Sequence, residues 1–156
     1  MIFIIIVLGI FLLDYNLKSY TNSHRIQGTE DQYFGGRLIL RNCHNGEGGF
    51  GLFKKNPKLG TEISAVVLIC VAWEFVKTFF TKGFALMKLG LSLVLGAGAS
   101  NFYDRITKGY VTDYFSLGVK NKKVRNTVFN LSGMFIFAGA VIYVIGYLTS
   151  KAGNKK

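Results

Sequence analysis

The sequence has few of the residues that build metal centres and disulfide frameworks. Its 156 residues include two cysteines and two histidines. Cys43 lies in a long polar segment and Cys70 in an apolar run, so we expect the two thiols to lie too far apart to pair. His24 and His44 are isolated, and we interpret both as solvated loop residues. The sequence therefore predicts no disulfide framework, metal or cofactor.

Acidic residues are also scarce. Eight Asp and Glu residues oppose nineteen Lys and Arg residues, which gives a net charge of +11. In a soluble protein this excess would suggest nucleic-acid binding, but the chain has no zinc-ligand spacing, RNA-binding signature or glycine-rich phosphate loop. Beside membrane spans, anionic lipid headgroups are the simpler partner for such charge. We expect contact with membrane lipid and none with nucleic acid.

Charge is absent from long stretches of the chain. Residues 126–150 contain no charged side chain and exceed the roughly 20 residues that a spanning helix needs. Residues 89–103 form a second uncharged run, extended to residue 84 across Lys88, whose long side chain can reach the interface. The sequence predicts four spans, at about 1–20, 60–80, 84–103 and 126–148.

The first predicted span has an alternative interpretation. Residues 2–13 are continuously apolar and need residues 14–20 to complete a crossing. The same run could be the core of a signal peptide, but no basic leader and no small-x-small cleavage site accompany it. We favour an uncleaved helix.

Four spans in a chain of this length predict a single domain, residues 1–156, built as one helical bundle. Both termini and the connection at 77–88 then lie on one side of the membrane. The segments 19–58 and 105–125 share the other side. These two segments and the adjoining Lys18 carry thirteen of the nineteen basic residues, and that count alone favours a cytoplasmic location for them.

The first long segment has its own local signals. Arg37–Arg41 is predicted as a short strand, and Asn45–Gly51 as a glycine-rich turn that lets backbone approach a partner closely. A hairpin tip without any ligand fits this composition equally well.

Acidic and amide side chains gather at the ends of the predicted spans. Asp14 and Lys18 stand one helical turn apart, an arrangement that in isolation usually anchors a helix at the interface. Asp113 lies in a short polar island at the rim of a span, where a carboxylate is costly enough to suggest function. We expect five such groups to converge near one membrane surface as a polar pocket: Asp14, Asn101, Asp104, Asp113 and Asn130.

Five segments occur in the order of the motifs of the bacterial lipoprotein signal peptidase family, also called signal peptidase II. They are Asp14–Lys18, Asn45–Gly51, Gly98–Arg105, Val111–Tyr114 and Phe129–Gly133. Each motif is weak alone, but the ordered set covers nearly the whole chain, which therefore resembles this family.

The resemblance implies an all-α membrane protein with four transmembrane helices and a small extracytoplasmic β-cradle in the first long loop. It implies an intramembrane aspartic endopeptidase, monomeric and without a cofactor. Such an enzyme removes the signal peptide of a prolipoprotein before a diacylglyceryl-modified cysteine, at the outer face of the bacterial cytoplasmic membrane. The thirteen basic residues would then face outward, where we expect salt-sensitive contact with anionic headgroups.

Residue by residue, Asp113 matches the first of the family's two catalytic aspartates. Asn45 matches a residue of the substrate-facing loop, and Asn130 matches the asparagine of the fourth-helix motif. Asp14 and Lys18 lie in the first motif, and Asn101, Asp104 and Arg105 match supporting polar residues, with Asp104 expected beside Arg105.

The chain departs from the family at the second aspartate. The family pattern Phe-Asn-x-Ala-Asp becomes Phe129-Asn130-Leu131-Ser132-Gly133, so Gly133 replaces the catalytic partner. Glu47 and Ser100 stand where the family favours glycine. An aspartic protease shares one proton between two close carboxylates, and losing one member of a catalytic set costs on the order of 10⁴-fold in rate. Rescue by Glu47 is conceivable, whereas Asp104 is a poorer substitute.

Three hypotheses follow. The chain is an active signal peptidase with an altered dyad. Alternatively, it is a non-catalytic relative that binds signal peptide, lipidated protein or lipid. A third class is an unrelated small transporter whose carboxylates bind ions. The order of the motifs argues against the third, and the missing aspartate favours reduced or lost peptidase activity.

Overall fold

The computed structural model describes residues 1–46 and 56–153 of the chain. Its elements follow the order α1 (Ile2–His24), β1 (Glu30–Tyr33), β2 (Leu38–Asn45), α2 (Pro57–Phe80), α3 (Ala85–Lys108), β3 (Val111–Leu117), α4 (Lys122–Asn126) and α5 (Leu131–Gly153). The long helices α1, α2, α3 and α5 are each long and apolar enough to cross a membrane. The predicted fold, four long helices with a small sheet, is confirmed.

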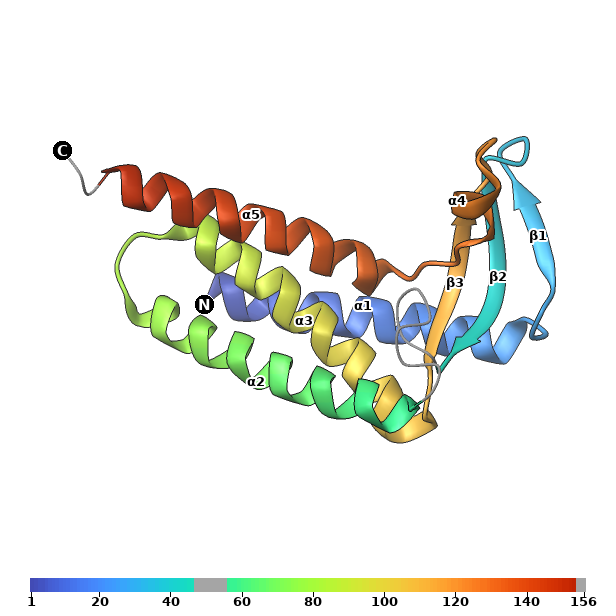
Figure 1. Ribbon diagram of the computed structural model, residues 1–156, viewed down its shortest axis with the longest axis horizontal. Helices are drawn as coiled ribbons and strands as arrows, with labels where there is room; N and C mark the ends of the chain where they lie inside the picture. The colour runs from blue at the N-terminus through green and yellow to red at the C-terminus, as the bar shows by residue number, and fades with distance from the viewer. Residues whose placement is uncertain (47–55, 154–156) are drawn as a thin grey trace.

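Helix α3 is the centre of the bundle, because it packs against α1, α2 and α5 (Figure 1). Small residues permit this packing. A Cβ atom on Gly90 would lie 2.6 Å from the carbonyl oxygen of Gly139, and one on Gly96 would lie 2.5 Å from that of Val7. Close backbone approach at glycines is the usual way in which membrane helices associate.

The two ends of the bundle differ. The start of α1, the end of α5 and the turn between α2 and α3 lie at one end, and the sheet lies at the other, with its strands crossing the helix axes (Figure 1). Helix α3 ends at Gly109, whose φ of 80° is left-handed, and the chain turns there directly into β3. This turn brings Asp113 close to the ends of α3 and α1.

The sheet is antiparallel in the order β1-β2-β3. Leu38 pairs with Leu117 and Cys43 with Asp113, and the register shifts between Leu40 and Cys43. Phe129 pairs with Phe115 on the free edge of β3. The predicted β-cradle therefore draws on more of the chain than expected. The first long loop supplies only two of its strands, and the connection between α3 and α5 supplies the third.

Three local expectations are corrected. Asp113 lies on strand β3 rather than at the rim of a span. The strand predicted at residues 37–41 continues to Asn45 as β2, and β1 was not predicted. The helix of the fourth predicted span, α5, begins at Leu131 and not at residue 126. Phe129 forms backbone hydrogen bonds with β3 and therefore cannot start a helix.

Alternation along β3 gives its two faces different neighbours. On one face, the Thr112 hydroxyl accepts from Asn22 of α1 and the Tyr114 hydroxyl donates to Asp14 of α1. On the other face lie Asp113 and Phe115. The sheet thus rests on α1 and presents Asp113 on its opposite side.

Candidate functional site

Asp14 is the most heavily hydrogen-bonded carboxylate in the described structure. Its Oδ2 accepts from Lys18 Nζ, Ser100 Oγ and Ser132 Oγ, each at 2.6 Å. Its Oδ1 accepts from the Tyr114 hydroxyl at 3.0 Å and from the Ser132 backbone N–H at 3.2 Å. These donors come from α1, α3, β3 and α5, and Asp14 and Lys18 are both 0 % exposed. The pair is an internal cross-link between elements and not the interface anchor expected of an isolated pair.

Lys18 extends this cluster toward the end of α3. Its Nζ donates to Asn101 Oδ1 at 2.8 Å and lies 3.4 Å from Asp104 Oδ2. The Asp104 side chain is 1 % exposed, and its Oδ1 accepts from Lys108 Nζ at 2.7 Å. Two buried carboxylates therefore share one buried lysine, and each carboxylate has further donors of its own.

The ion pair of Asp104 is made with Lys108 and not with its neighbour Arg105. Lys108 contacts Asp104 because residues four apart lie on the same helix face, whereas adjacent residues do not. Arg105 instead points its guanidinium toward the Asn101 carbonyl, at 3.5 Å. Asp104 Oδ2 also accepts the backbone N–H of Thr112 at 3.1 Å, which fixes the start of β3 against α3.

Asp113 has a simpler environment. Its Oδ1 accepts from Asn130 Nδ2 at 2.6 Å, and its Oδ2 accepts from Asn45 Nδ2 at 2.9 Å. The residue is 6 % exposed. Burial disfavours the ionised carboxylate and raises the pKa of Asp113 to about 6, although the two amide hydrogen bonds and the positive charge of Lys18 oppose the rise.

Asn130 connects Asp113 to Gly133. Its Nδ2 donates to Asp113, while its Oδ1 accepts the backbone N–H of Gly133 at 2.6 Å at the start of α5. Gly133 is exposed, and a Cβ atom there would meet only Asn130 Oδ1, at 3.3 Å. Asn130 Oδ1 is therefore the atom that a side chain at position 133 would have to accommodate.

Among residues 1–46 and 56–153, no second carboxylate is hydrogen-bonded to Asp113. Asp14 and Asp104 are engaged in the Lys18 cluster. Within the same described ranges, no group of three His, Cys, Asp or Glu side chains could hold a metal ion. Glu47, the conceivable substitute, and the rest of the predicted glycine turn through Gly51 lie outside the described residues.

The expectation for His44 was also wrong. Its ring is half-buried and stacks on Tyr110, with centroids 3.9 Å apart, and its Nε2 lies 3.2 Å from Asn22 Oδ1. Burial lowers the pKa of His44, which favours the neutral ring. His24 is exposed as expected. Both cysteines are free, in agreement with the sequence.

The chain matches one protein family over most of its length. The family described as Signal peptidase (SPase) II matches residues 6–149. This chain belongs to the signal peptidase II family.

Full-length relatives share this assignment. The chain is 26% identical to a lipoprotein signal peptidase of Lactiplantibacillus plantarum, over 99% of both chains. It is 29% identical to a lipoprotein signal peptidase of Streptococcus pneumoniae, over 92% of this chain and 90% of the relative. A solved bacterial membrane enzyme superposes with a TM-score of 0.81 at 20% identity, covering 99% of this chain and 91% of the other, which shows a shared fold. The chain is thus a multi-pass membrane protein of a bacterial membrane-enzyme family.

Two serines that we expected to depart from the signal peptidase II pattern meet at one atom. The hydroxyls of Ser100 and Ser132 both donate to Asp14 Oδ2. The sequence gives these serines no role, because their separation along the chain carries no sign of contact. Tyr114, whose hydroxyl also accepts the Leu131 N–H at 2.9 Å, was missed for the same reason.

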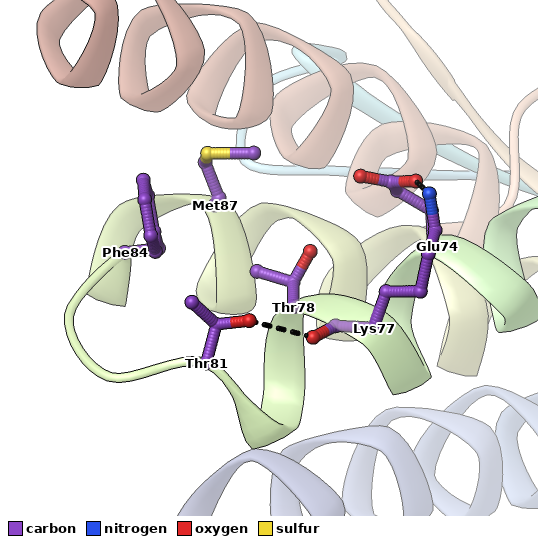
Figure 2. Close-up of a pocket in the computed structure, with 6 residues that line it drawn as sticks. All are labelled: Glu74, Lys77, Thr78, Thr81, Phe84 and Met87. Carbon is purple, nitrogen blue, oxygen red and sulfur yellow. Dashed lines mark hydrogen bonds and ion pairs between the residues drawn. The ribbon is translucent and has the colours of Figure 1, made fainter.

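A separate cavity of about 260 Å³ lies at the opposite end of this signal peptidase II fold, beside the turn between α2 and α3 (Figures 1 and 2). It is lined by Glu74, Lys77, Thr78, Thr81, Phe84 and Met87. Figure 2 shows the Lys77 ammonium against the Glu74 carboxylate, at 2.5 Å. The cavity is remote from Asp113 and contributes nothing to the candidate site.

Proposed function

We propose that this chain binds the signal peptides of diacylglyceryl-modified prolipoproteins at Asp113 and cleaves them slowly or not at all. The observation that carries the proposal is the Asn130 bridge between Asp113 and Gly133. It supports the alignment of Gly133 with the family's second catalytic position, at which this chain has no side chain.

Hydrolysis by an aspartic protease needs two different carboxyl groups. The ionised one takes a proton from water as the water oxygen attacks the scissile carbonyl, and the protonated one donates to the carbonyl oxygen. Asp113 can serve as the base, because a pKa of about 6 leaves it mostly ionised at neutral pH. Asn130 and Asn45 donate hydrogen bonds but have no acidic proton to transfer. The general acid is the missing element.

The binding half of the proposal rests on what remains around Asp113. Phe115 lies on the same face of β3, and its ring packs on Phe129 with centroids 6.2 Å apart. Apolar side chains beside a hydrogen-bonded carboxylate suit an extended, apolar signal peptide. The partly exposed amide of Asn45 supplies a polar contact for its backbone.

Transport is a weaker candidate. A carboxylate that binds ions needs free lone pairs and a path to solvent. Asp14 and Asp104 are 0 % and 1 % exposed and already accept several hydrogen bonds each. We therefore assign them a role in holding the helices, the strand and Asn101 in place around the site.

The proposed orientation places the sheet end at the outer face of the cytoplasmic membrane, as the family relationship implies. A reporter fusion in the turn that contains Lys82 tests this. Activity of a reporter that works only in the cytoplasm would support this orientation. Activity of a reporter that works only outside the cytoplasm would contradict it.

The functional test measures binding and cleavage on one sample. Fluorescence anisotropy of a labelled diacylglyceryl prolipoprotein gives the affinity of the purified protein, and gel electrophoresis of the same mixture gives its turnover. We expect saturable binding with turnover on the order of 10⁴-fold below that of a two-aspartate family member. Turnover comparable to such an enzyme, lost in Glu47→Gln, would instead establish an active enzyme with a substituted dyad.

A further inference from the structure

The outer corner of the sheet combines exposed apolar side chains with a cluster of positive charge. We define this sheet tip as the turn Tyr33–Arg37 and the segment Leu117–Arg125. The two parts are joined by a hydrogen bond from the Gly118 N–H to the Arg37 carbonyl, at 2.8 Å. A Cβ atom on Gly118 would overlap the Gly36 carbonyl oxygen, so the two backbones are in direct contact.

Phe34 occupies the end of this turn in an unfavourable conformation. Its φ of 53° lies in the left-handed region, which a bulky side chain rarely adopts. The residue is 79 % exposed, and Leu117 and Val119 of the same sheet tip are 42 % and 40 % exposed. An exposed aromatic ring at a strained turn position is a reason to look for an apolar partner.

The charged residues of the sheet tip all have one sign. They are Arg37, Lys120, Lys122, Lys123 and Arg125, all of them exposed. None of them forms an ion pair with a residue in the described ranges. The acidic residues of β1 lie outside the tip, and each pairs elsewhere: Asp31 with Arg25 and Glu30 with Arg41.

The position of the sheet tip relative to the bundle suggests its surroundings. The strands cross the helix axes, so the tip projects sideways beyond the first turn of α5 rather than along the bundle (Figure 1). A membrane crossed by α5 has one of its headgroup layers near the first turn of this helix. Aromatic rings with neighbouring Lys and Arg are typical of segments that lie in a membrane interface.

We propose that the sheet tip is a lipid-binding patch, in which Phe34 inserts among the acyl chains and the five cations contact anionic headgroups. The patch holds the outer corner of the sheet against the membrane. It requires neither cleavage nor signal-peptide binding, so it stands or falls separately from the proposed function.

The test uses tryptophan as a depth probe in the full chain. Phe34→Trp is made in a Trp73→Phe background, which leaves one tryptophan, and the protein is reconstituted in nanodiscs of phosphatidylcholine with or without phosphatidylglycerol. We expect acyl-chain-brominated lipid to quench the introduced indole at least twofold more strongly when phosphatidylglycerol is present, and 0.5 M salt to remove the difference. Changing Lys120, Lys122, Lys123 and Arg125 together to Gln is expected to remove it as well.

The matched control changes Lys82 and Lys151 to Gln at the other end of the bundle, and quenching is expected to stay unchanged. An introduced indole that stays unquenched in every lipid would overturn the proposal. Strong quenching that does not depend on phosphatidylglycerol, salt or the four substitutions would show an apolar contact alone. That result would contradict headgroup binding. Loss of the effect in 10 mM inorganic phosphate at constant ionic strength would point to a free-anion site instead.

Discussion

Asp14 and Asp113 lie in neighbouring parts of one polar layer, but their environments are opposite. Asp14 accepts five hydrogen bonds from four elements and is sealed from solvent. Asp113 accepts two, both from neutral amides, and the position next in line beyond Asn130 is an exposed glycine. Asp14 is held by donors from every element around it, whereas Asp113 has two donors and no hydrogen-bonded second carboxylate among the described residues.

The difference separates the two tasks of the polar layer. The Asp14 cluster joins α1, α3, β3 and α5 and so fixes where Asp113 and Asn130 lie. Ser100 and Ser132 supply two of the hydroxyl donors to Asp14. The positioning part of the polar layer is therefore densely hydrogen-bonded, whereas Asp113 has two amide donors and no hydrogen-bonded second carboxylate among the described residues. This difference fits the proposed function, in which the chain keeps the binding site and loses the reaction.

The largest effect is expected at Asp14. Asp14→Asn leaves Lys18 buried with one carboxylate in place of two, and breaking a buried ion pair costs about 3–5 kcal/mol. Thermal unfolding in detergent, followed by the fluorescence of Trp73, measures the loss. Asp31→Asn is the control, because its carboxylate is exposed and loss of its ion pair with Arg25 should cost about 0–1 kcal/mol. Equal effects of the two substitutions would deny Asp14 its central structural role.

The pH dependence of stability is expected to come from Asp113. Its folded pKa of about 6 lies above the unfolded value of 3.8, so its contribution to stability is full below about pH 4 and is lost as the pH rises through 6. The shift corresponds to about 3 kcal/mol. Unfolding measured from pH 4 to 7 should show this loss in the wild type and not in Asp113→Asn. The same slope in both proteins would mean that burial does not raise the pKa of Asp113.

Smaller effects are expected from the two serines. Ser100→Gly and Ser132→Ala each remove a hydrogen bond to a charged oxygen, worth about 1.5–3 kcal/mol, and the glycine adds its own helix penalty. Because both hydroxyls donate to Asp14 Oδ2, the double variant should be non-additive by at least about 0.5 kcal/mol in a double-mutant cycle. Ser92→Ala, whose hydroxyl bonds only the Lys88 carbonyl, is the control and should add independently to either change.

The sequence predicted the bundle well because uncharged runs have few structural alternatives in a membrane. It predicted only one of the three strands of the sheet. Strand β1 is polar and exposed at all four positions, so it lacks the alternation that identifies a half-buried strand. The polar residues of β3 were recognised in the sequence, but the strand itself was not. Its partner β2 lies more than sixty residues away, and such pairing leaves no local signal.

The candidate site was predicted in part for similar reasons. Polar groups at matching helix ends must meet, and Asp14, Asn101, Asp104, Asp113 and Asn130 do lie in one connected network. The hydroxyl donors could not be predicted, since serine and tyrosine occur in many environments. Asp104 pairs with Lys108 rather than with the adjacent Arg105, which shows that adjacency in sequence is a poor guide to side-chain pairing on a helix.

The most direct measurement is prolipoprotein cleavage by Gly133→Asp. We expect this one substitution to raise turnover at least 100-fold over the wild type. Gly133→Asn introduces a side chain of the same size without a carboxyl proton and should not raise turnover. Adding Asp113→Asn to Gly133→Asp should abolish the gain in turnover. Binding of the prolipoprotein should change little across the series. A wild type that cleaves as fast as Gly133→Asp and loses this activity in Asp113→Asn would contradict the proposed function.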